Sequence, residues 1–66
     1  SVSIRIYLGL AYQHLGREAE ARLEFEEAVR LSEEAVAALP DYARASHQLG
    51  VALYAAGREE EAGPYL

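Results

Sequence analysis

The sequence predicts an all-α fold in which antiparallel helical hairpins stack on one another, and three observations support this prediction. A segment repeats at a constant offset, from Leu8 to Leu49 and without a slip, and a fixed period in this range is typical of stacked supersecondary units. Apolar residues recur at intervals of three and four along most of the chain, as they do on one buried face of a helix. Glycine and proline separate these periodic runs, and both residues commonly end helices.

The repeat pairs residues that lie 41 positions apart. The first copy contains Leu8, Gly9, Ala11, Tyr12, Gly16, Arg17, Glu18, Glu20 and Ala21, and the second contains Leu49, Gly50, Ala52, Leu53, Gly57, Arg58, Glu59, Glu61 and Ala62. Stacked repeats usually work by presenting a binding face. The repeat therefore directs the search for function to surfaces rather than to reactive groups.

The first helix is predicted over residues 2–15. Its expected buried stripe has intervals of three and four, and consists of Ile4, Leu8, Ala11, Tyr12 and Leu15. Gly16 follows, and glycine ends helices because it adopts the left-handed conformation without steric cost. We therefore expect a tight turn at Gly16.

The second helix is predicted over residues 17–39 and is the longest. Its heptad-like stripe consists of Ala21, Phe25, Ala28, Ser32, Ala35 and Leu39, a spacing that keeps one face toward a partner helix. Pro40 ends the helix because the residue before a proline is pushed out of helical geometry.

The third helix is predicted over residues 42–56, with Asp41 as its side-chain cap and a glycine turn at Gly57. Its stripe consists of Ala45, Leu49, Ala52, Leu53 and Ala56. A fourth helix begins over residues 58–62 and then meets Gly63-Pro64. Proline is tolerated in a first helical turn but not deeper, so this last helix is either kinked or short.

Composition restricts the classes of partner. The 66 residues carry a net charge of −5, and all six basic residues are arginines spread along the chain. Nucleic acids and anionic membranes need clustered positive charge, so neither is expected as a partner. No apolar run reaches the ~18 residues of a membrane span, and no export signal precedes the helices, so a cytoplasmic location is expected.

The residues that carry the repeat resemble the tetratricopeptide repeat, and the resemblance covers essentially the whole chain. The first repeat supplies Leu8, Gly9, Tyr12, Gly16, Ala21, Phe25, Ala35 and the closing Pro40, and the second supplies Leu49, Gly50, Leu53, Gly57 and Ala62, with Leu66 at the Phe25 position. The resemblance implies one domain over residues 1–66, an α-solenoid fragment with a repeat over 2–40 and a partial repeat over 41–66.

The repeat is longer than the family's usual period of about 34 residues. The seven surplus residues lie between Phe25 and Ala35 in the second helix, and a heptad keeps the same helical face inward with a drift of only ~20°. The lengthened repeat is similar to the extended repeats of kinesin light chain. Because about three repeats are usual for independent stability, we expect the chain to be part of a longer array, or neighbouring chains to complete the stack.

The resemblance implies a function in binding proteins. In the family, the first helices of successive repeats line a concave groove that holds an extended peptide or a partner helix. The groove residues implied here are Ile6, Leu10, Gln13, Arg44, His47, Val51 and Tyr54. This face suits a ligand with apolar side chains and a carboxylate. The same residues could instead pack against another repeat or subunit, so self-assembly into a homo-oligomer through exposed repeat faces is the alternative function.

Other specialised roles are not expected. The family's chaperone-tail adaptors grip a carboxylate with Lys and Asn, but here Ile6 and Leu10 stand at two of those positions and the chain contains no Lys. The two histidines, His14 and His47, have no cysteine and only one aspartate, Asp41, in the chain to converge with. We therefore predict no catalytic residues, no metal site, no cofactor and no enzyme activity.

Overall fold

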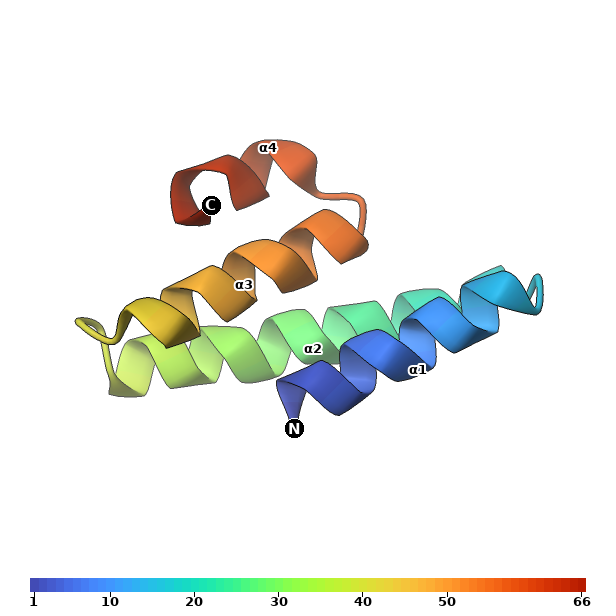
Figure 1. Cartoon of the computed structure of the whole chain (residues 1–66), viewed down its shortest axis with the longest axis horizontal. Helices are drawn as coiled ribbons and strands as arrows, with labels where there is room; N and C mark the ends of the chain where they lie inside the picture. Colours follow the sequence, from blue (N-terminus) through green and yellow to red (C-terminus); the bar gives the residue numbers. More distant parts are fainter.

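The structure, a computed structural model that describes residues 1–66, consists of helices joined by short turns. The helices are α1 over Val2–His14, α2 over Glu18–Ala38, α3 over Ala43–Ala55 and α4 over Glu59–Ala62, followed by the 3₁₀ turn η1 over Gly63–Tyr65. Figure 1 shows α1 and α3 running in the same direction, both antiparallel to α2. The predicted all-α fold of stacked antiparallel hairpins is confirmed. No helix combines the length and the apolar character needed to cross a membrane.

Two glycine turns end α1 and α3 in the same way. Gly16 has φ +76° and Gly57 has φ +81°, the left-handed region that side chains with a Cβ rarely adopt. In each turn the next backbone N–H donates back across the glycine, from Arg17 to the Tyr12 carbonyl and from Arg58 to the Leu53 carbonyl, both at 2.8 Å. These hydrogen bonds satisfy carbonyls that the helix end leaves free.

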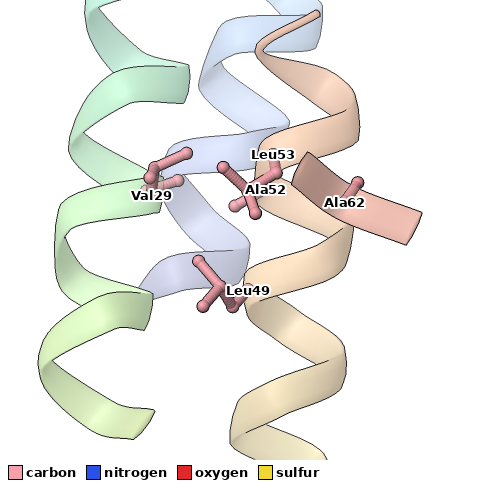
Figure 2. Packing of buried hydrophobic residues seen from close by; sticks show 6 residues of the cluster. Val29, Leu49, Ala52, Leu53 and Ala62 are labelled. Carbon is pink, nitrogen blue, oxygen red and sulfur yellow. The ribbon is translucent and has the colours of Figure 1, made fainter. Parts of the chain in front are cut away.

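The hydrophobic core lies mainly between α2 and α3. It consists of Ala28, Val29, Leu49, Ala52, Leu53 and Ala62. Figure 2 shows Val29 of α2 pointing toward Leu53 and Ala52 of α3, with Ala62 of α4 on the other side of α3. Small residues dominate this contact, and they allow helix axes to approach to about 8–10 Å.

The prediction of which residues the first helix buries is wrong. Four of its five residues are exposed: Ile4, Leu8, Ala11 and Leu15. The side of α1 that faces α2 instead carries Gly9, which is buried against the ring of Phe25. Helical spacing identifies residues that share a face, but it does not identify which face has a neighbour.

Two details at the end of α2 also differ from expectation. Leu39 lies beyond the last helical residue and is exposed rather than buried. Tyr42, not Asp41, is the N-cap of α3, and no side chain caps this helix. The reason is that the turn after Pro40 extends through Asp41, with a hydrogen bond from the Tyr42 N–H to the Leu39 carbonyl at 3.0 Å.

The last helix was expected to be either kinked or short, and the structure shows that it is short. α4 contains four residues and continues into η1, where Pro64 stands in the first turn. This placement of Pro64 is sterically permitted because the first helical N–H groups have no partner within the helix. The chain end then brings Leu66 against Gly50, as Phe25 lies against Gly9 in the first copy of the repeat.

An ion pair recurs with the repeat. It joins Arg17 to Glu20, and Arg58 to Glu61. The hydrogen bonds from Arg58 hold the pKa of Glu61 below its ordinary value of 4.5. Arg58 also contacts Glu26 of α2 at 3.0 Å, so it links the turn before α4 to the neighbouring hairpin.

Ser32 places a polar group in the core, and we expect its removal to stabilise the chain. Ser32 is fully buried, and its Oγ has no hydrogen-bond partner, an arrangement that costs about 1–3 kcal/mol. Ser32→Ala should raise the free energy of unfolding by about 1 kcal/mol, measured by urea unfolding. Half-buried Ser46 in α3 provides the control Ser46→Ala, which makes the same chemical change without removing a buried hydroxyl. Equal effects of the two substitutions would contradict this explanation.

Candidate functional site

The candidate site lies where α1 and α3 run beside each other. A shallow hollow of about 120 Å³ separates the two helices and is lined by Ser3, Ile6, Tyr7 and Val51. Three of these residues come from the first two turns of α1, and Val51 comes from the second half of α3. The hollow is therefore formed by two helices that are far apart in the sequence.

The two helices are staggered along α2. Figure 1 shows α1 along one end of α2 and α3 displaced toward the other end. Val51 corresponds by the repeat to Leu10, yet it lies beside Ser3 and Tyr7, about one heptad earlier in α1. α2 has 21 residues, whereas α1 and α3 have 13 each, so α2 is long enough for α1 and α3 to pack at different positions along it.

The structure brings together two of the seven residues expected to line the groove. Ile6 and Val51 both line the hollow, and Ile6 is half-buried because it also packs against the core. The other five, which are exposed and do not line the hollow, are Leu10, Gln13, Arg44, His47 and Tyr54.

Ser3 and Tyr7 line the hollow although sequence reasoning missed them. Ser3 corresponds by the repeat to Arg44, which was among the expected groove residues, so the repeat alone could have identified Ser3. Tyr7 corresponds to Gln48, and no repeat position pointed to it. The length of α2 was the available signal, since a stagger of one heptad places residues 3–7 opposite Val51.

Acidic residues are confined to one part of the fold. All eleven acidic residues lie in α2, in α4 or at Asp41, and α1 and α3 contain none. α1 and α3 carry the basic residues Arg5 and Arg44. Arg5 donates to Glu24 of α2 at 2.9 Å, and this hydrogen bond raises its pKa, whereas Arg44 makes no ion pair and is exposed. α1 and α3 therefore present no negative charge, and Arg44 is an unpaired positive group near the start of α3.

The arrangement offers binding surface rather than reactive groups. His14 and His47 lie on different helices, and no three His, Asp or Glu side chains are grouped to hold a metal ion. α1 and α3 carry exposed apolar and aromatic side chains instead: Tyr7, which lines the hollow, and Leu10 and Tyr54, which do not. Such groups favour contact with another chain.

Comparison with known proteins identifies the repeat. The family model described as tetratricopeptide repeat matches residues 2–66, which is nearly the whole chain. No match was found among curated proteins or among solved structures. Repeats of this family generally mediate protein–protein interactions and are typically non-catalytic scaffold modules.

Proposed function

The chain belongs to the tetratricopeptide repeat family, and from this premise we propose that it binds an apolar peptide or a partner helix through the face of α1 and α3. The proposed site keeps the residues expected from the repeat, Ile6, Leu10, Gln13, Arg44, His47, Val51 and Tyr54, and adds Ser3 and Tyr7. All nine residues lie on α1 or α3, and seven of them are exposed.

The observation that carries the proposal is the apolar hollow on a face without acidic residues. Val51 and Ile6 both line it, and a single apolar side chain of a ligand fits a hollow of about 120 Å³. Exposed Tyr54 and Tyr7 can add contact area, since tyrosine combines a large apolar ring with a polar end. Unpaired Arg44 favours a ligand with a carboxylate at that end of the face.

We further infer that the repeats are of the lengthened type similar to those of kinesin light chain. The seven extra residues of α2 and the stagger of α1 and α3 support this inference. A ligand that contacts both Leu10 and Val51 must then cross α1 and α3 obliquely, because these equivalent residues are offset along the helix axes. The division into a repeat over 2–40 and a partial repeat over 41–66 remains part of the same proposal.

A peptide screen tests the proposed site. We expect peptides selected from a random library by the unmodified chain to bind Val51→Glu, Leu10→Glu and Tyr54→Ala at least about tenfold more weakly, a loss of about 1.4 kcal/mol each. Titration calorimetry on the selected peptides provides the measurement. Leu23→Glu is the control, because Leu23 is 71% exposed on α2 and lies outside the proposed site. Selected peptides that bind all four variants equally would exclude this face.

A further inference from the structure

We propose that the ion pair between Arg5 of α1 and Glu24 of α2 positions the peptide site, because it fixes the N-terminal half of α1 on α2. This inference rests on the proposed function and adds two residues that lie outside the proposed site. They act on a ligand through the residues that line the hollow, so Arg5 and Glu24 are positioning residues.

The ion pair joins α1 to α2 beside the hollow. Arg5 Nη1 donates to Glu24 Oε1 at 2.9 Å, and no other hydrogen bond between side chains joins these two helices. Along α1, Arg5 stands between Ser3 on one side and Ile6 and Tyr7 on the other. These three residues supply most of the lining of the hollow, so the ion pair holds the part of α1 that shapes it.

Arg5 has one carboxylate with which it can pair. The side chain of Glu24 is 18% exposed, the lowest value among the partners in the ion pairs of the chain, and Arg5 is the one side chain that donates to it. Glu27 also interacts with the charge of Arg5, but two nitrogens of Arg30 donate to it. A charge-assisted hydrogen bond to a single, partly buried partner holds Arg5 in one position.

The ion pair is not part of the repeated scaffold. In the second copy of the repeat, Ser46 stands at the position of Arg5 and Tyr65 at that of Glu24, so the second copy packs its helices without this contact. The ion pair that follows each glycine turn, in contrast, occurs in both copies. The requirements of a helical hairpin therefore do not account for Arg5 and Glu24.

The other contacts of α1 leave its N-terminal half free to pivot. The ring of Phe25 against Gly9 fixes one point of the helix, and Val2 and Ile6 pack on the core through apolar contacts, which have no preferred direction. Ser3 lies ~9 Å from Gly9 along the helix, so a pivot of ~10° about Gly9 moves Ser3 by ~1.5 Å. A directional hydrogen bond one turn from Gly9 prevents this movement and keeps the width of the hollow constant.

Binding of an uncharged peptide tests the positioning role. The probe is a peptide that the unmodified chain selects from a library without charged residues and with blocked termini, so it has no charge for Arg5 to attract. Arg5→Gln and Glu24→Gln should each weaken its binding about threefold, as expected for a partly exposed ion pair. The double variant should weaken binding no further, and the exchange Arg5→Glu with Glu24→Arg should restore most of the affinity.

Glu34→Gln is the matched control. It makes the same change on the same helix and removes an ion pair with Arg30 at 2.6 Å, but this pair lies within α2 and does not hold α1. The affinity for the peptide should therefore stay unchanged. Circular dichroism checks that each variant is as helical as the unmodified chain.

A distance measurement tests the position of α1 without a ligand. Spin labels are attached to cysteines at Ile4 of α1 and Ala37 of α2, which are exposed and outside the proposed site, in a chain with no cysteine of its own. Double electron–electron resonance should give a narrow distribution of distances between the labels. Arg5→Gln and Glu24→Gln should broaden this distribution, whereas Glu34→Gln should not.

Two results would overturn the positioning role and leave the proposed peptide site in place. The first is an uncharged peptide whose binding is weakened by Val51→Glu but not by Arg5→Gln, together with an unchanged distance distribution. The second is an acidic peptide that binds Arg5→Gln more weakly and Glu24→Gln more tightly, because a released Arg5 then contacts the ligand directly. Equal binding to Val51→Glu and to the unmodified chain would exclude the site itself, and the role of the ion pair in binding with it.

Discussion

Replacing Gly9 with leucine is expected to unfold the chain, and replacing it with alanine should destabilise it by about 1–3 kcal/mol. A Cβ at Gly9 would meet Phe25 Cε1 and lie 2.7 Å from Cδ1, well inside the ~3.5 Å at which carbon atoms attract. The Phe25 ring is buried and cannot move away without opening the contact between α1 and α2. A chain of 66 residues has only about 3–10 kcal/mol of stability, so the larger leucine side chain exceeds what the fold tolerates.

Two other glycines provide controls for this substitution. Gly63→Ala places a Cβ where nothing lies within 4 Å, and alanine is favoured over glycine by up to ~1 kcal/mol in a helix. A Cβ at Gly50 would lie 2.8 Å from Leu66 Cδ2 and 2.9 Å from Tyr65 Cβ, a less severe overlap than at Gly9, and Leu66 and Tyr65 are exposed whereas Phe25 is buried. Urea unfolding should therefore rank the alanine variants from Gly9, the least stable, through Gly50 to Gly63. Equal stability of the Gly9 and Gly63 variants would contradict the packing of Phe25 on Gly9.

Leu49→Ala should cost about 2–5 kcal/mol, whereas Leu8→Ala should cost less than about 1 kcal/mol. The two leucines occupy the same position in the two copies of the repeat. Leu49 is buried in the core between α2 and α3, and its removal leaves a cavity. Leu8 has no neighbouring helix on its side of α1 within the chain, so its removal leaves little empty space.

The comparison is informative because both variants change the same residue type at the same helical position. Helix propensity therefore cancels, and the difference reports tertiary burial. Thermal unfolding of the two variants provides the measurement. A similar cost for both variants would show that an undetected contact covers Leu8 in the monomer.

Most of the local structure could be predicted from the sequence. The helix ends followed from residues with restricted or unusual backbone freedom: Gly16 and Gly57 adopt the left-handed conformation, and Pro40 follows the end of α2. These are local steric properties of the chain. The repeat likewise indicated that Leu66 would occupy the position of Phe25, and it lies against Gly50 as expected.

The face that α1 buries could not be predicted. Ile4, Leu8 and Leu15 have the spacing of a buried stripe, but no helix of the chain covers them. Periodicity records which residues share a side of a helix, and burial also requires a neighbour on that side. Gly9 marks the side that is covered, because only a residue without a Cβ admits the Phe25 ring.

The residues around the hollow could be predicted only in part, for a related reason. Its residues were assigned by repeat position, which treats α1 and α3 as aligned. The structure staggers them, so Ile6 and Val51 meet with Ser3 and Tyr7, while Leu10 and Gln13 lie farther along α1. The length of α2 permits the stagger, which becomes visible only when the three helices are placed together.

The sequence by itself therefore determined the helices, their turns, the antiparallel order and the family, because each depends on local sterics and on a repeat that can be read along the chain. The tertiary structure alone decided which faces are buried and which residues of α1 and α3 are neighbours. The neighbours of each residue depend on the offset between α1 and α3 along α2. The burial of each face depends on whether another helix packs against it. A residue is buried only when another helix packs against it, and the spacing of residues within one helix does not show whether such a helix is present.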